Sequence, residues 1–113
     1  MTGPMIVEGF FADQGAPQAF GKSAVITARP AKLFYVTAFN KGGSTVYIEL
    51  YDHPSAATGT PRVLPLAAGG YVGWSQVLLR NGGFIRAVDA ASGGNLIAGD
   101  DVKFDFGYTD WIV

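Results

Sequence analysis

The sequence predicts an all-β protein folded as a single antiparallel β-sandwich of seven or eight strands. Apolar and polar residues alternate with period two along several short runs, a pattern typical of half-buried strands. Turn residues recur about every 8–15 residues, and no segment keeps a helical period for long. Two antiparallel sheets packed face to face would bury such strands most economically. A jelly roll is one candidate topology, and a partly closed barrel is the alternative.

The chain divides into an N-terminal part, residues 1–21, and a sandwich domain, residues 22–113. Glycine and proline punctuate residues 1–21, so this part is expected to be either an arm or an irregular first strand. The first regular strand is expected at residues 23–28. It ends at Arg29-Pro30, because a proline restricts the backbone of the residue before it.

The clearest feature is a pair of β-rich runs within residues 32–53. Residues 33–39 are apolar on both faces, as expected of a strand in the middle of a sheet. Residues 46–51 alternate strictly between aliphatic side chains and polar or aromatic ones. Between the two runs, Asn40-Lys41-Gly42-Gly43 accepts positive φ, so the runs are expected to form an antiparallel hairpin.

A long loop and a short strand follow this pair. Residues 52–62 contain two prolines and a glycine, and the loop is too long for a tight turn. We therefore expect it to cross from one sheet to the other. The next strand, residues 63–66, contains Pro65. It is placed at a sheet edge, because proline has no N–H to donate to a neighbouring strand.

The remaining strands are expected at residues 71–79, 84–90 and 102–109. Val72, Trp74 and Gln76 share one parity in the first of these, and Asn81-Gly82 predicts a two-residue hairpin leading into the second. The last strand has the cleanest alternation. The aliphatic and aromatic positions expected to face one common core are Val46, Ile48, Leu50, Val102, Phe104, Phe106 and Tyr108.

Composition argues against several classes of function. Charged residues make up 15% of the chain and the net charge is −1, with lysine and arginine dispersed, which argues against nucleic acid or an anionic membrane as partner. No apolar run approaches the roughly 18 residues of a membrane helix, and the start lacks a signal peptide, so synthesis in the cytosol is expected. The low charge hints that partners cover part of the surface.

The residue pattern also argues against an enzyme, a metal or a cofactor. His53 is the one histidine, and it is expected to be a loop residue at a strand end. Asp100-Asp101 lacks the spaced ligands of a calcium loop. Ser44 and Ser75 lack a general base at a recognisable spacing. No glycine pair carries the lysine of a phosphate-binding loop.

Two sets of side chains are candidates for binding. Tyr47, Tyr51 and Trp74 could present rings to a carbohydrate, and the alternative is that these rings pack in the core. Apolar groups also stand near both ends of the chain, where they need something to cover them. These residues are Met5, Ile6, Val7, Phe10, Phe11, Trp111, Ile112 and Val113.

The order of the pieces resembles a group of small phage virion proteins of β-sandwich type, which includes capsid decoration (cement) proteins. The resemblance covers about residues 30–110. The residues that carry it are Lys32-Leu33, Asn40, Leu50-Tyr51-Asp52, Gly59-Thr60-Pro61, Ala68-Gly69-Gly70, Gly83-Phe84-Ile85-Arg86-Ala87 and the run from Asp100 to Phe106.

This resemblance implies a non-enzymatic virion structural protein, most simply a decoration protein that binds the shell as a homo-oligomer. Its partners would be further copies of itself and a major capsid or other virion protein. A trimer is favoured, because decoration proteins often sit where three capsomers meet. The alternative is a β-sandwich module that binds carbohydrate or a host surface, either free or on a tail.

Overall fold

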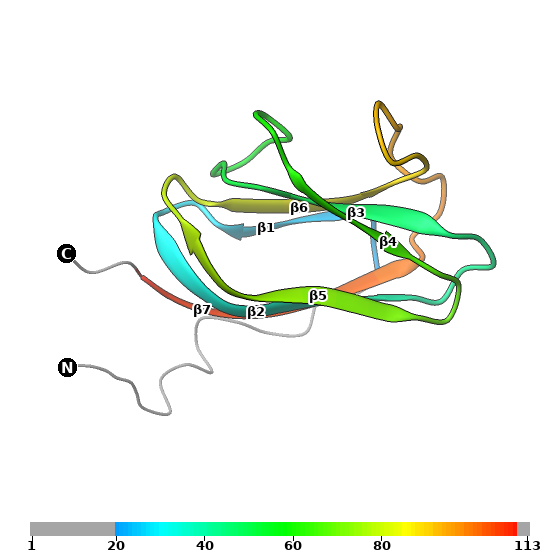
Figure 1. The fold of residues 1–113 in the computed structure, drawn as a ribbon, viewed down its shortest axis with the longest axis horizontal. Helices are drawn as coiled ribbons and strands as arrows, with labels where there is room; N and C mark the ends of the chain where they lie inside the picture. Colours follow the sequence, from blue (N-terminus) through cyan, green and yellow to red (C-terminus); the bar gives the residue numbers. More distant parts are fainter. Residues whose placement is uncertain (1–19, 111–113) are drawn as a thin grey trace.

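The computed structural model describes residues 20–110, which form two antiparallel β-sheets packed face to face (Figure 1). The predicted β-sandwich is thereby confirmed. None of the described residues forms a helix able to span a membrane. The strands are β1 (Ser23–Thr27), β2 (Ala31–Asn40), β3 (Val46–Tyr51), β4 (Arg62–Leu66), β5 (Tyr71–Leu79), β6 (Gly83–Val88) and β7 (Val102–Asp110).

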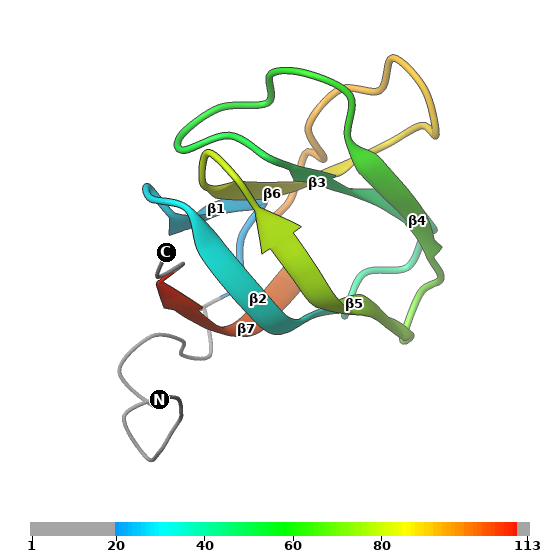
Figure 2. The ribbon, with the colours of Figure 1, turned by 60° about the vertical axis from the view of Figure 1, so that its left-hand side comes forward.

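One sheet has four strands in the order β1-β6-β3-β4, and the other has three in the order β5-β2-β7. Every neighbouring pair is antiparallel. Figure 2 shows β5, β2 and β7 side by side in the lower layer, with β2 in the centre as its two apolar faces predicted. A jelly roll has eight strands, whereas the described residues form seven, divided four and three.

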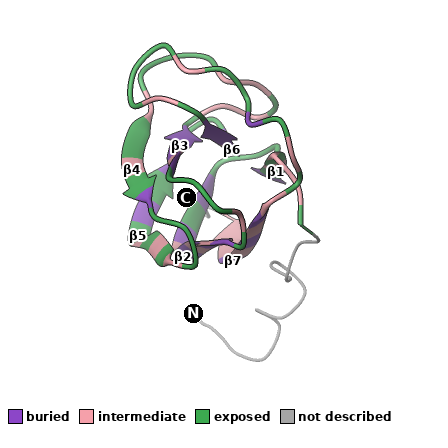
Figure 3. Cartoon of the chain, turned by 90° about the vertical axis from the view of Figure 1, so that its right-hand side faces the viewer, coloured by how far each residue is buried: buried purple, intermediate pink, exposed green. Residues whose placement is uncertain are grey.

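The core lies between the two sheets and follows the period-two pattern (Figure 3). The predicted core positions are confirmed. Phe104 and Ile48 are 1% and 0% exposed, and Tyr108 is partly buried against the same cluster. The other predicted members are also buried in it, namely Val46, Leu50, Val102 and Phe106.

The predicted hairpin between β2 and β3 is wrong, because these strands belong to different sheets. Their connection is an arch across the edge of the sandwich. Buried Asn40 holds the arch: its Nδ2 donates to the carbonyls of Ser44 and Leu66, and its Oδ1 accepts from the N–H of Gly42. The glycines and Asn40 do form a turn, but a turn can reverse the chain within one sheet or between two sheets. Here β2 pairs with β5 and β7, so the turn leads to the other sheet.

Two further connections also differ from expectation. Asn81-Gly82 joins β5 to β6, which lie in different sheets, so it too is an arch. Gly82 has φ +140°, and a Cβ there would lie 2.6 Å from Cα of Pro54, so the arch is wedged against the β3–β4 loop. That loop does not cross between the sheets, because β3 and β4 are neighbours. It leaves the four-stranded sheet and returns to it (Figure 1).

The parity of β5 reverses at Gln76, which has φ +56°. Val72 and Trp74 pack against the core, whereas beyond Gln76 the inward residues are Val77 and Leu79. The sequence pattern gave Gln76 the parity of Trp74, but Gln76 is exposed. The pairing of β2 with β7 shifts register at the same level. Two steps along β2, from Leu33 to Tyr35, oppose one step along β7, from Tyr108 to Gly107, so β2 carries one extra residue there. The prediction that β4 lies at a sheet edge is confirmed.

Candidate functional site

The outer face of the three-stranded sheet carries a row of rings that the core does not use. Cross-strand pairing places Phe39 of β2 between Tyr71 of β5 and Lys103 of β7. Tyr35 likewise lies between Ser75 and Gly107. We call this surface the aromatic face, defined by Phe20, Tyr35, Phe39 and Tyr71.

Three of these rings form one cluster near the end of β2. The ring centroids of Phe39 and Tyr71 are 4.8 Å apart, and those of Phe20 and Phe39 are 6.2 Å apart. The Lys41 ammonium lies 4.5 Å from the centroid of Phe20, within the range of a cation–π contact. Tyr71 is nevertheless 71% exposed, so an apolar ring remains open to a partner.

Tyr35 extends the aromatic face toward the middle of the sheet by lying over a glycine. A Cβ placed at Gly107 would come within 2.6 Å of Cε1 of Tyr35, so only glycine leaves room for this ring. Ring packing over a strand glycine covers the exposed backbone. Tyr35 is 45% exposed. The result is an outer sheet surface with rings at two levels of the sheet.

Between these two levels lies Asp105, paired across the sheet with Thr37. Its Oδ1 atom is buried and has no hydrogen-bond partner within residues 20–110. Buried polar atoms are nearly always satisfied, so an orphan oxygen in the middle of an apolar face requires an explanation.

The outer face of the four-stranded sheet is different, because polar groups there satisfy one another. Glu49 Oε1 accepts hydrogen bonds from the Arg86 Nε at 2.6 Å and from the Tyr51 hydroxyl at 2.7 Å, and Arg86 also donates to Tyr51. Glu49 and Tyr51 are only 4% and 5% exposed. Such a satisfied cluster, the Glu49 clamp, fixes the register of β3 on β6.

The Glu49 clamp shifts the protonation of two of its members. Burial raises the pKa of Tyr51, and the hydrogen bond to the Glu49 carboxylate and its charge raise it further. Burial acts to lower the pKa of Arg86, but the bond and charge of Glu49 outweigh it, so the pKa of Arg86 also rises. The raised pKa values keep the Tyr51 hydroxyl and the Arg86 guanidinium protonated over ordinary pH, which suits a structural role.

His53 organises the β3–β4 loop. Its Nδ1 accepts hydrogen bonds from the N–H groups of Ser55 and Ala56, at 3.1 and 3.0 Å. This is the loop role that the sequence predicted. Among the described residues, no group of three or more His, Cys, Asp or Glu side chains could hold a metal ion.

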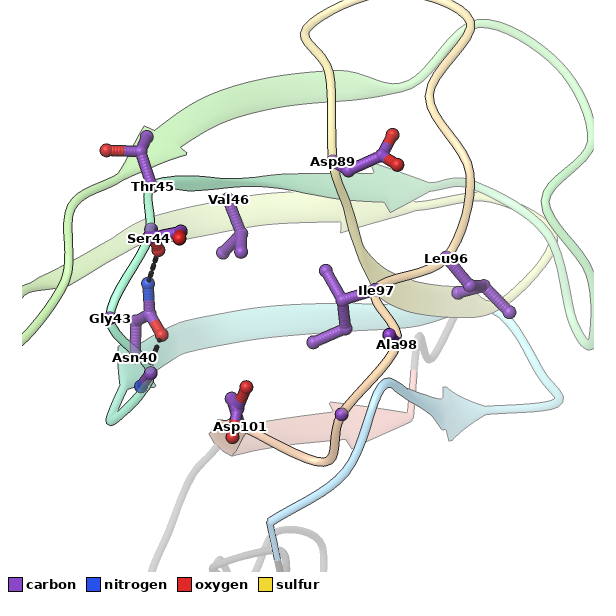
Figure 4. Close-up of a pocket in the computed structure, with 12 residues that line it drawn as sticks. Asn40, Gly43, Ser44, Thr45, Val46, Asp89, Leu96, Ile97, Ala98 and Asp101 are labelled. Carbon is purple, nitrogen blue, oxygen red and sulfur yellow. Dashed lines mark hydrogen bonds between the residues drawn. The ribbon is translucent and has the colours of Figure 1, made fainter.

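A pocket of about 340 Å³ opens at one end of the sandwich, between the β2–β3 arch and the β6–β7 loop (Figure 4). Its polar groups include the carboxylates of Asp89 and Asp101, while Val46, Leu96 and Ile97 supply apolar surface. One carboxylate oxygen of Asp89 is already engaged, because Oδ1 accepts a hydrogen bond from the N–H of Asn95. The pocket contains hydrogen-bonding groups and apolar patches but no aromatic ring.

The structure does not gather the predicted binding residues into one site. Both groups of apolar end residues, Met5 to Phe11 and Trp111 to Val113, lie outside the described residues. Tyr47 and Tyr51 are on β3, with Tyr51 buried in the Glu49 clamp. Trp74 is on β5 in the other sheet, half-buried against the core. These three rings therefore do not form a shared platform for a sugar.

Sequence reasoning missed the aromatic face, although a signal was present. Tyr35, Thr37 and Phe39 alternate with Val36 and Ala38, so β2 has an aromatic face as well as an aliphatic one. The missing information was which face would be covered. That depends on the register of β5 and β7, which places glycines and small residues beside these rings.

Comparison of the chain with protein-family models, with curated proteins and with solved structures found no match.

Proposed function

We propose that this protein is a non-enzymatic structural component of a virus particle that attaches to a protein shell through the aromatic face of its three-stranded sheet. The virion setting rests on the resemblance to small phage virion proteins described above. The sheet architecture is compatible with it.

The observation that carries the proposal is the exposure of Tyr71 and Tyr35 beside Phe39 on one face of the sheet. Contiguous apolar patches on soluble proteins commonly mark contacts with other proteins. Tyrosine is suited to such contacts, because its ring buries a large area while its hydroxyl keeps a hydrogen bond. An open sheet face also fits a broad protein surface better than a small ligand, which normally binds in a concave site.

The polar groups of the described chain support a non-enzymatic role. His53 is engaged by loop N–H groups through Nδ1, and the Glu49 clamp satisfies its own members. Neither set presents a nucleophile with an adjacent base. The end pocket is lined by two carboxylates and by the hydroxyls of Ser44 and Thr45, but by no histidine or lysine.

Binding to shells purified without this protein would test the proposal. The double variant Tyr35→Ser/Tyr71→Ser should raise the dissociation constant for shells at least about tenfold, because removal of central aromatic contacts commonly costs about 2 kcal/mol or more. The control is Val25→Ser/Leu96→Ser, which removes two exposed apolar side chains, 48% and 47% exposed, located away from the aromatic face. Wild-type occupancy by the tyrosine variant would refute this attachment surface.

Carbohydrate binding is a second candidate function, favoured by the end pocket. The carboxylate of Asp101 beside the apolar Leu96 and Ile97 offers the mixture of acceptors and apolar contact that a sugar needs. A glycan array with the wild type and Asp101→Asn would test it. A hit lost in that variant, together with failure to bind shells, would make this the leading function.

A further inference from the structure

The end pocket, about 340 Å³ in volume, contains two carboxylates that the fold leaves without a counter-charge. Asp89 directly follows β6 and Asp101 directly precedes β7, so two separate strand ends bring them to one pocket. Figure 4 shows their side chains on either side of Ile97. Neither carboxylate forms an ion pair within the described chain, where the ion pairs join other residues. No lysine, arginine or histidine of that chain lines the pocket.

The basic residue of the β2–β3 arch does not supply the missing charge. The N–H of Lys41 donates to the carbonyl of Asp101 at 2.9 Å, but its ammonium lies over the ring of Phe20 and does not line the pocket. Like charges that share a concave site with apolar walls create a potential that attracts the opposite charge. The end pocket therefore favours a cation.

Two glycines leave the Asp101 carboxylate uncovered. A Cβ placed at Gly42 or at Gly99 would lie only 3.0 Å from Oδ2 of Asp101, closer than ordinary van der Waals contact. Neither glycine has a positive φ, so what glycine provides at these positions is room beside the carboxylate. Asp101 is accordingly partly exposed and open to a ligand.

The pocket offers more hydrogen-bond acceptors than donors. Both amide hydrogens of Asn40 already bond to backbone carbonyls, and its Oδ1 accepts from a backbone N–H. No hydrogen bond within the described chain uses Oδ2 of Asp89 or the carboxylate of Asp101. The remaining side-chain donors are the hydroxyls of Ser44 and Thr45. A ligand with several N–H donors and no acceptor fits this set better than a sugar, whose hydroxyls also need donors.

The apolar wall of the pocket suits an aliphatic stem. Val46 and Ile97 line it and are each 8% exposed. The N–H of Ile97 donates to the carbonyl of Ala87 at 3.2 Å, which fixes this wall to β6. An alkyl chain can cover such a wall while a charged head at its end reaches the carboxylates.

We propose that the end pocket is a binding site for an alkyl cation, an ammonium or guanidinium group carried on a short aliphatic chain. The charged head donates hydrogen bonds to Asp101 and to the free oxygen of Asp89, and the chain lies against Val46 and Ile97. Hydrogen bonds between a cation and a carboxylate are about twice as strong as those between neutral groups. A free amine and the side chain of a lysine or arginine share this chemistry.

Titration of the full-length protein with small probes, followed by nuclear magnetic resonance, tests the site. The probes are n-butylammonium and n-propylguanidinium chloride, and n-butanol is the uncharged control. The cations should shift the methyl resonances of Val46 and Ile97 saturably, with dissociation constants of millimolar order, as expected for ligands of so few atoms. Absence of saturable shifts with both cations would overturn the proposal, and so would equal binding of n-butanol.

A pair of neighbouring acids supplies the matched variants. Asp101→Asn keeps the shape but removes the charge, so it should raise the dissociation constant of the cations at least about tenfold. Asp100→Asn makes the same change in net charge at an exposed residue that does not line the pocket, and it should leave the constant unchanged. Equal effects of the two variants would show a general effect of net charge and would overturn the site.

A second variant tests the other carboxylate. Asp89→Asn keeps the Oδ1 acceptor that the N–H of Asn95 uses, and removes only the charge. It should also weaken binding of the cations, at least about threefold, because one oxygen of this carboxylate already has a partner. Wild-type affinity in Asp89→Asn, together with wild-type affinity in Asp101→Asn, would overturn the proposal.

Further probes separate the sources and the competing ligands. Nα-acetyl-lysine methylamide should bind as n-butylammonium does if the pocket takes a side chain of a protein, whereas a free amine as ligand predicts binding of n-butylammonium alone. Methyl glycosides and calcium chloride test a sugar and a metal ion. Saturation by either of these, without a response to the alkyl cations, would overturn the assignment.

Discussion

At the residue scale, Phe104 occupies the centre of the inter-sheet core. It is 1% exposed, the largest of the fully buried side chains, and lies on β7 opposite Ala38. Phe104→Ala should therefore lower the free energy of unfolding by about 3–5 kcal/mol, because the substitution loses apolar burial and leaves a cavity. Chemical denaturation with urea measures this loss.

The control for this prediction is Leu96→Ala, a loss of apolar volume at a side chain that is 47% exposed and lies in the β6–β7 loop, away from the aromatic face. In the free protein it should change the unfolding free energy by only about 0.5 kcal/mol. Similar losses for the two variants would mean that the core does not lie between the sheets.

A second residue-scale prediction concerns Tyr51 in the Glu49 clamp. Burial and the Glu49 carboxylate raise the pKa of Tyr51 above its ordinary value of 10.0. The unfolded chain therefore releases this proton at lower pH than the folded one. Stability is unaffected below about pH 10 and falls as the pH rises toward the raised folded-state pKa, because ionisation then favours unfolding.

Tyr51→Phe lacks the ionisable group, so its stability should decline less than that of the wild type above pH 10. Urea midpoints measured from pH 8 to pH 11 give this comparison, and the other tyrosines contribute equally to both proteins. Parallel curves would show that the Tyr51 hydroxyl titrates no differently in the folded state.

At the scale of elements, the positive φ of Gln76 determines which side chains of β5 reach the core. Its φ of +56° is unfavourable for a β-branched residue, because the branch clashes with the backbone in this conformation. Gln76→Val should destabilise the protein by about 1–2 kcal/mol, and Ser75→Val, at a neighbouring exposed position of the same strand, should not.

Thermal denaturation of both valine variants is the measurement. Gln76→Gly supplies a check on the mechanism, because glycine adopts positive φ without strain. Its melting temperature should equal or exceed that of the wild type. A Gln76→Val protein as stable as Ser75→Val would indicate that the parity of β5 is not held by this backbone conformation.

The strands themselves could be predicted from sequence because period two and turn residues are local properties. Their pairing could not, because Asn40 to Gly43 and Asn81-Gly82 have the chemistry of a reversal without specifying a sheet. The observed arches depend on distant contacts, such as the bond from Asn40 to Leu66 and the fit of Gly82 against Pro54. Local pattern therefore gave the elements, and long-range packing gave the topology.

The candidate site was harder to predict for the same reason. Period two places Tyr71 and Trp74 on opposite faces of β5. Only the folded structure shows which of these faces packs against the core. Glu49 and Arg86 are 37 residues apart, and their ion pair depends on the β3–β6 register. Asp105 looked like an ordinary outward position of the last strand, and its orphan oxygen emerges only in the folded sheet.

At the scale of the whole molecule, the two outer faces have opposite characters. The four-stranded sheet carries the satisfied Glu49 clamp, and the two long loops rise from this side (Figure 1). The three-stranded sheet carries exposed rings and one unsatisfied oxygen. The outer face of the four-stranded sheet therefore suits contact with solvent and with the chain's own loops. The outer face of the three-stranded sheet suits contact with a partner, as the proposed attachment to a shell requires.

The last prediction is that the free protein self-associates through the aromatic face, with a trimer favoured. Light scattering should give a mass above the 11.9 kDa of one chain, and Tyr35→Ser/Tyr71→Ser should return it to that value. Because apolar contacts dominate, raising sodium chloride from about 0.1 to 1 M should not dissociate the oligomer, whereas an ion-pair interface would weaken. A wild-type mass of one chain at every concentration would refute the homo-oligomer. If that monomer still bound shells and the tyrosine variant did not, the aromatic face would contact the shell protein directly, with no role in self-association.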